Sequence, residues 1–159
     1  MITPADDLDR ILAVMSAAFD PAYGEAWTRR QVEDALLLGN CHYLLVGSDG
    51  ATADESDAAG FSLSRTGVDE EELLLFAVAP SHRRRGLGRK MLDALAQSAR
   101  NRGATRLLLE MRRGNPAESL YRAFGFQAIG ERPNYYRLPY GERIDAITFA
   151  CDISTMPIE

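Results

Sequence analysis

Residues 73–103 combine an apolar run, a turn rich in arginine and glycine, and an amphipathic pattern, in that order. The run from Leu73 to Val78 predicts a strand buried on both faces, which ends before Pro80 because proline has no N–H group to donate to a neighbouring strand. Apolar residues then recur at helical spacing up to Gly103, namely Met91, Leu92, Leu95, Ala96 and Ala99. The free N–H groups at the start of this helix and the arginines before it would meet at one point, which predicts a binding site for phosphate groups.

The turn itself, Arg83-Arg84-Arg85-Gly86-Leu87-Gly88-Arg89, matches neither of two common nucleotide-binding motifs. A triphosphate P-loop needs Ser or Thr after its lysine, but Lys90 is followed by Met91; a dinucleotide motif would need glycine at position 91. A surface loop with solvated arginines is the alternative for an isolated turn of this kind. A nucleic-acid-binding face is disfavoured because the chain carries a net charge of -5. The strand before the turn and the helix after it favour the binding of a diphosphate.

A second apolar run, Arg106–Met111, predicts a strand parallel to the first, because a helical crossover joins the two. Glu110 interrupts this run and shares a face with Leu108, so its carboxylate is expected to be partly desolvated. A carboxylate in such a position is suited to act as a general base. The alternative is a glutamate at the end of a strand that reaches water.

A short helix is predicted next, capped by Asn115, with Pro116 at its first position and Glu118 completing a capping box. Gly125 is expected to end it. Tyr121 lies within this helix and is either a proton donor or a packing residue with its hydroxyl at the surface.

The remaining elements follow from the same patterns. An apolar stripe from Leu8 to Phe19 predicts a first helix, which Pro21 ends. Thr28, with Gln31 three positions later, is predicted to cap a second helix that closes at Gly39. Further strands are predicted at Cys41–Val46, Ala59–Ser64, Phe126–Glu131 and Arg143–Asp152.

The loop Gly47–Ala58 is acidic and rich in small residues, so we expect it to be mobile. The chain has 159 residues, of which 46% are hydrophobic, which is typical of one compact domain spanning residues 1–159. Alternating strands and helices favour a mixed sheet with helices on both of its faces.

The composition excludes several other classes of protein. Cys41 and Cys151 are too few for a disulfide framework, and with His42 and His82 they do not have the spacing of zinc ligands. The acidic N-terminal residues do not resemble a secretory signal, and no apolar run is long enough to span a membrane. We therefore expect a reduced, cytoplasmic protein.

The motifs in this order resemble those of the GNAT superfamily of N-acetyltransferases. The matching segments are EELLLFAVAPSHRRRGLGRKML, LLLEMRRGN, SLYRAFGF and NYYRLPYGERIDAI. Within the superfamily, Asn134-Tyr135-Tyr136 and Asp145-Ala146-Ile147 resemble the RimI-type enzymes, which acetylate the N-terminal alanine of a small-subunit ribosomal protein. The resemblance implies the GNAT fold, a mostly antiparallel twisted sheet with a central, splayed pair of parallel strands and helices on both faces.

The resemblance also implies that acetyl-coenzyme A lies between those parallel strands, along the edge of the first. The cofactor contacts that it implies are Phe76, Ala77, Val78, Arg84, Arg85, Gly86, Leu87, Gly88, Arg89 and Asn115. Glu110 would be the base that deprotonates the acceptor amine, and Tyr121 would donate a proton to the departing thiolate. The N–H group of Val78 would face the developing oxyanion.

The acceptor contacts implied by the resemblance are Glu25, Trp27, Tyr135 and Tyr136. For the two adjacent tyrosines, packing on the sheet is the alternative. The implied function is transfer of an acetyl group to a protein N-terminal α-amine by a monomer that needs no metal and binds neither nucleic acid nor membrane directly. A GNAT enzyme for small-molecule amines and a non-catalytic module that binds acyl-coenzyme A are the alternatives.

Overall fold

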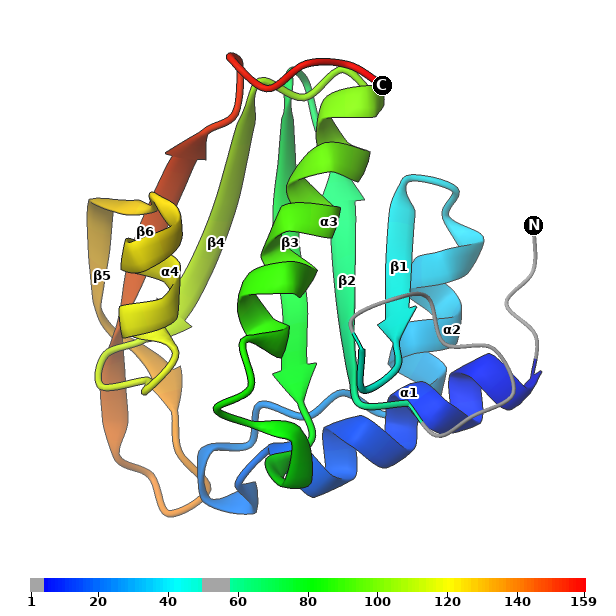
Figure 1. The fold of residues 1–159 in the computed structure, drawn as a ribbon. Coiled ribbons are helices and arrows are strands. Elements are labelled where there is room, and N and C mark those ends of the chain that lie inside the picture. The colour runs from blue at the N-terminus through cyan, green and yellow to red at the C-terminus, as the bar shows by residue number, and fades with distance from the viewer. Residues whose placement is uncertain (1–4, 50–57) are drawn as a thin grey trace.

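The computed structural model describes residues 5–49 and 58–159, so the greater part of the loop predicted to be mobile lies outside the described residues. Its strands form one mixed sheet in the order β1-β2-β3-β4-β6-β5, shown in Figure 1. The strands are β1 (Cys41–Val46), β2 (Gly60–Thr66), β3 (Glu70–Val78), β4 (Arg106–Arg112), β5 (Gln127–Arg137) and β6 (Arg143–Asp152). The α-helices are α1 (Ala5–Ala18), α2 (Arg29–Leu37), α3 (Leu87–Asn101) and α4 (Glu118–Phe124). Only the central pair β3 and β4 is parallel, which confirms the mixed, mostly antiparallel sheet with a central parallel pair.

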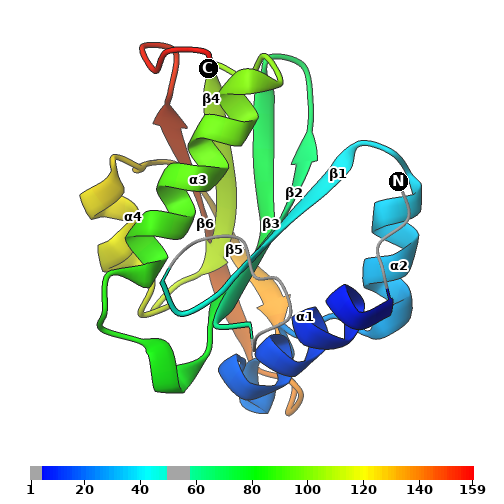
Figure 2. The same cartoon turned by 45° about the vertical axis from the view of Figure 1, so that its right-hand side comes forward.

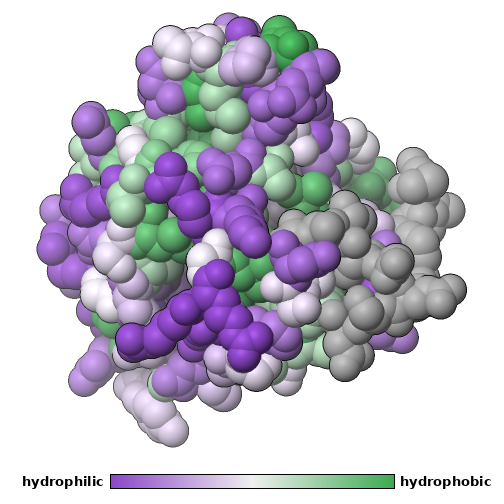
Figure 3. Space-filling model, viewed as in Figure 1, coloured by the Kyte–Doolittle hydropathy of each residue, from purple (hydrophilic) through white to green (hydrophobic). Residues whose placement is uncertain are grey.

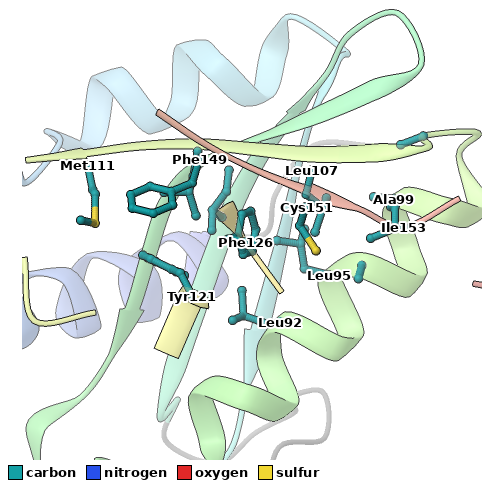
Figure 4. Close-up of a cluster of buried hydrophobic side chains, with 14 of the residues drawn as sticks. Leu92, Leu95, Ala99, Leu107, Met111, Tyr121, Phe126, Phe149, Cys151 and Ile153 are labelled. Atoms are coloured by element: carbon teal, nitrogen blue, oxygen red, sulfur yellow. The ribbon is translucent and has the colours of Figure 1, made fainter. Parts of the chain in front are cut away.

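Helices cover both faces of this sheet, as expected. Figures 1 and 2 show α1 and α2 against one face and α3 and α4 against the other. On the α1 side, the core is built from helix residues such as Ile11 and Met15 and strand residues such as Phe61. On the α3 side, Figure 4 shows Leu92 and Leu95 packed toward the strands.

The parallel pairing of β3 with β4 covers only part of each strand. It joins Glu70–Leu73 to Arg106–Leu109 and then stops. At the same level, the register between β2 and β3 shifts, which leaves Leu74 as an extra residue in β3. Such a bulge bends a strand and increases its local twist. Beyond it, β3 and β4 separate, and Figure 1 shows the gap between their ends.

Both faces of β3 pack against a core, as predicted, although only alternate residues are fully buried. Leu73 belongs to the core on the α3 side, whereas Leu75 and Ala77, beyond the bulge, belong to the core on the α1 side. Leu73, Leu75 and Ala77 are buried, whereas the residues that alternate with them are only partly buried. Phe76 and Val78 belong to the partly buried set, and both border the cleft described below.

The helix boundaries show one success and one error of the sequence patterns. Thr28 and Gln31 form the predicted capping box at the start of α2. In contrast, α4 begins at Glu118 and not after Asn115. The Asn115 side chain instead accepts a hydrogen bond from the N–H group of Ala117 (2.9 Å), forming a turn before the helix. The strand β5 is also longer than predicted, and it is irregular in two places.

The paired end of β3 and β4 carries a buried ion pair that the sequence patterns did not indicate. The Glu71 side chain has no exposed surface, and Arg102, just after α3, donates to both of its oxygens at 2.9 and 2.5 Å. Ser64 donates a third hydrogen bond (2.6 Å). Burial opposes ionisation of Glu71, but these hydrogen bonds outweigh it, and the pKa of the carboxyl lies below its ordinary value of 4.5. The pair thus connects the end of α3 to the sheet.

Within the described residues, no helix combines the length and apolar character needed to cross a membrane.

Replacing Arg102 with methionine is expected to lower the free energy of unfolding by about 3 kcal/mol, because a buried carboxylate would lose its partner. The matched control is Arg65→Met, which breaks the exposed pair with Glu72 and should cost less than about 1 kcal/mol. Urea denaturation measures both.

The pKa of Glu71 is lower in the folded protein than in the unfolded chain, so its ionised form stabilises the fold at neutral pH. That contribution is lost as pH falls through the folded-state pKa. The cost of Arg102→Met should therefore be full at pH 7 and smaller well below pH 4.5. Equal costs for the two variants would contradict this account.

Candidate active site

A cleft of about 990 Å³ opens where β3 and β4 separate. Its walls come from the unpaired ends of the two strands, the segment between α1 and α2, the turn before α3, and the beginning of α4. Figure 3 shows strongly hydrophilic side chains in the lower half of this face, over the region where Figure 1 places the turn. Apolar strand residues and charged turn residues therefore meet in one hollow.

The unpaired end of β3 lines the cleft with all three residues expected there, Phe76, Ala77 and Val78. The N–H group of Ala79 donates to the carbonyl of Ala59 (2.8 Å), on the side of β2. Because successive N–H groups along a strand point to opposite sides, the N–H group of Val78 points toward the gap. This edge can therefore accept an extended ligand as a further strand would pair.

The beginning of α3 provides backbone donors on the same side of the cleft. Gly86 precedes the helix in the left-handed conformation (φ 76°), and among the described residues no side chain caps the helix. The first helical hydrogen bond to Gly86 comes from Lys90, so the N–H groups of Leu87, Gly88 and Arg89 lack helical partners. Such an end attracts anions, and this arrangement fits a diphosphate.

The two glycines of the turn differ in what they do. A Cβ atom on Gly86 would meet no atom of residues 5–49 or 58–159 within 4 Å. A Cβ atom on Gly88 would lie 2.8 Å from a methyl group of Leu120 in α4. Gly88 thus lets α3 and α4 approach each other, in addition to bordering the cleft.

The side chains of the four arginines in the turn make different contacts. Arg83 holds the wall together, donating to the carbonyls of Val78 and Ala18 (both 3.1 Å). Arg84 borders the cleft, with its backbone in the left-handed region (φ 63°). Arg85 is not among the lining residues, and the guanidinium of Arg89 turns toward α4, donating to the carbonyl of Ala123 (3.3 Å).

The carboxylate of Glu110 lies on the opposite face of β4 from the α3-side core, with its side chain 19% exposed. It accepts a hydrogen bond from the Thr148 hydroxyl (3.1 Å) and forms an ion pair with Arg132 (3.2 Å). Neither partner was foreseen from the sequence, because both come from strands more than twenty residues later. The carboxylate borders the cleft and is oriented by two contacts, as a general base requires.

Tyr121 reaches the cleft from the other side of the sheet. Its ring packs edge-on against Phe76 and Phe126, with ring centroids 5.9 and 5.7 Å apart, and Figure 4 shows it at one end of the core cluster. Burial raises the pKa of Tyr121 well above its usual range, and the negative charge of Glu25 adds to this effect. The phenol is thus protonated at physiological pH and can act as a donor. Asn115 also borders the cleft, through the turn before α4.

The residues expected to contact the acceptor divide into two groups. Glu25, Trp27 and Tyr136 line the cleft. Burial raises the pKa of Tyr136 to about 12, with the charges of Glu110 and Glu25 contributing. Tyr135 does not line the cleft: it is 48% exposed, and its ring packs edge-on against that of Tyr136, with centroids 5.2 Å apart.

Two further lining residues, Arg112 and Tyr23, were missed in the sequence. The signal for Arg112 was present: it lies two positions after Glu110, and alternation along a strand places both side chains on the same face. For Tyr23 no local pattern pointed to the cleft.

Comparisons with known proteins agree with this arrangement. Residues 8–126 match the acetyltransferase (GNAT) family. The [ribosomal protein bS18]-alanine N-acetyltransferase of Salmonella typhimurium is 41% identical over 104 residues, which are 65% of this chain and 69% of that protein. Its counterpart in Haemophilus influenzae is 34% identical over 98 residues, 62% of this chain and 67% of that one.

Among solved structures, the ribosomal-protein-S18-alanine N-acetyltransferase of Escherichia coli superposes with a TM-score of 0.75 and 28% identity, covering 99% of this chain and 94% of the other. The family match spans most of the chain and includes the turn, Glu110 and Tyr121. On these grounds the chain belongs to the GNAT family of acetyltransferases.

Proposed function

We propose that this protein transfers the acetyl group of acetyl-coenzyme A to the α-amine of a protein N-terminus, the N-terminal alanine of a small-subunit ribosomal protein. The observation that carries the proposal is the meeting of Glu110 and Tyr121 in one cleft at the point where β3 and β4 separate. The relatives named as bS18-alanine N-acetyltransferases support the choice of acceptor.

The cofactor fits the groups that the cleft presents. The free N–H groups at the start of α3 and the side chain of Arg84 would hold the diphosphate, and the edge at Phe76–Val78 would pair with the pantetheine arm. The thioester then lies between a carboxylate and a phenol. Of the expected diphosphate contacts, Arg84 is the best placed, since Arg89 is directed at α4 and Arg85 lies outside the cleft lining.

The side chains divide the proton transfers between them. A peptide α-amine has a pKa of about 7.7–8.0, so much of it is protonated at neutral pH. Glu110 accepts its proton, directly or through a water molecule, and the amine forms a C–N bond with the acetyl carbonyl. An N–H group on the unpaired edge of β3, near the level of Glu110, stabilises the oxyanion that develops. The C–S bond then breaks as the nitrogen releases its second proton to water, and Tyr121 donates its proton to the thiolate. Solvent then reprotonates Tyr121 and takes the proton from Glu110.

The proposal includes the setting of the reaction. The enzyme acts as a monomer in the cytoplasm and needs no metal, because proton transfer and backbone donors supply the chemistry described above. Nucleic acid and membrane are not partners in it; the partner is the acceptor protein. Tyr136, which lines the cleft, would contact the acceptor, and Tyr135 packs edge-on against its ring.

Two variants test the catalytic roles. Glu110→Gln and Tyr121→Phe should each lower kcat/KM by about 100-fold, because each removes one proton-transfer group. Thiol release from acetyl-coenzyme A measures the rate, and calorimetry should show that coenzyme A still binds. If both variants keep the unmodified rate, the assigned roles are wrong.

The acceptor class is tested with three substrates in the same thiol assay. A peptide that begins with free alanine should be acetylated, whereas the same peptide with a blocked N-terminus and an internal lysine, and a simple polyamine, should not. Turnover of the polyamine alone would favour an enzyme for small-molecule amines. Binding of coenzyme A without turnover of any acceptor would favour a non-catalytic module.

Replacing Arg84 with alanine is expected to raise the Kd for coenzyme A by about tenfold, because a charge-assisted contact with phosphate is lost. Arg106→Ala is the matched control: this exposed arginine pairs with Glu70 at the other end of the sheet and should leave the Kd unchanged. Isothermal titration calorimetry measures both. Equal affinity for Arg84→Ala and the unmodified protein would place the diphosphate elsewhere.

A further inference from the structure

The segment between α1 and α2, residues 19–28, forms a wall of the cleft without belonging to the sheet. Tyr23, Glu25 and Trp27 are partly buried, and the residues between them are exposed. All three border the cleft, on the side where the acceptor is expected. Because this segment has no strand pairing in the described structure, its position depends on side-chain contacts.

Arg112 makes two such contacts from the end of β4. Its guanidinium lies 3.6 Å from the centre of the Tyr23 ring, and its Nε is 3.4 Å from a carboxylate oxygen of Glu25. Arg112 is only 9% exposed, although it carries a charge. A planar guanidinium that stacks on a ring and pairs with a carboxylate fixes the orientation of both partners.

We propose that Arg112 is a positioning residue, whose contacts with Tyr23 and Glu25 hold the α1–α2 segment against the acceptor side of the cleft. The inference rests on the proposed function, since it assigns a role in binding the acceptor peptide. Arg112 shares the face of β4 that carries Glu110. The same strand therefore positions the proposed base and, through Arg112, the wall of the cleft formed by residues 19–28.

The position of Glu25 explains why this wall matters for the acceptor. Glu25 lines the same cleft as Tyr121 and Tyr136, and its negative charge contributes to the raised pKa values of both phenols. An acceptor amine arrives largely as an ammonium ion, which a carboxylate attracts. Release of Glu25 from Arg112 would let that carboxylate turn to solvent and would loosen the wall.

The first test compares two neighbouring arginines. Arg112→Met should raise the KM for an alanine peptide by about tenfold, with kcat changed less than about threefold and the KM for acetyl-coenzyme A unchanged. The matched control is Arg113→Met, because Arg113 is exposed and pairs with Glu131 and Asp145 outside the cleft. Equal effects of the two variants, or an effect of Arg112→Met on the KM for acetyl-coenzyme A alone, would overturn the proposal.

A second readout does not depend on turnover. Trp27 is the only tryptophan of the chain and lies in the segment that Arg112 contacts. Acrylamide should quench its fluorescence more strongly in Arg112→Met than in the unmodified protein or in Arg113→Met. If the unmodified protein acetylates no peptide, the proposed function fails while this comparison still tests the contact. Unchanged quenching in a folded Arg112→Met protein would overturn the contact itself.

A mutant cycle distinguishes a positioning role from a merely structural one. If Arg112 acts through its two partners, Arg112→Met should have little further effect on the peptide KM in a background that carries both Tyr23→Leu and Glu25→Gln. Multiplying effects in that background would overturn the positioning role. Arg112→Lys provides a milder variant should Arg112→Met fail to fold; it keeps the charge but not the planar stack, so an intermediate KM is expected and an unchanged KM would contradict the role.

Discussion

The incomplete pairing of β3 with β4 is the constraint from which the other features of the cleft follow. The two strands are joined only from Glu70–Leu73 to Arg106–Leu109, and the bulge at Leu74 turns β3 away immediately afterwards. A strand edge inside a protein exposes backbone groups that need partners. At the other end, the buried pair of Glu71 with Arg102 holds the strands and α3 together, so the opening is confined to one end of the sheet.

The opening also brings together groups from the two faces of the sheet. Alternation along β4 sends Leu109 and Met111 into the core under α3 and α4, and it sends Glu110 and Arg112 to the opposite face. Tyr121 belongs to the first side and Glu110 to the second, and only a gap between strands lets one ligand lie between them. A closed sheet with the same residues would keep the proposed acid and base apart.

The local patterns of the sequence predicted more of the fold than of the site. Hydrophobic periodicity and the Thr28 cap are short-range signals, and they located the strands, the parallel pair and α2, although β3 starts earlier and β5 ends later than predicted. The partners of Glu110 and the contacts of Arg112 join residues far apart in the chain, where no short-range pattern applies. Consecutive arginines before α3 look alike in sequence, yet Arg83 fastens a wall and Arg84 faces the cleft.

Amide hydrogen exchange along β3 tests most directly whether the thioester arm pairs with this strand. The account predicts that saturation with acetyl-coenzyme A slows exchange at Val78, whose N–H group points into the gap, and leaves Leu73 in the paired region unchanged. Exchange at Val78 that stays the same while acetyl-coenzyme A is bound would show that the ligand lies elsewhere.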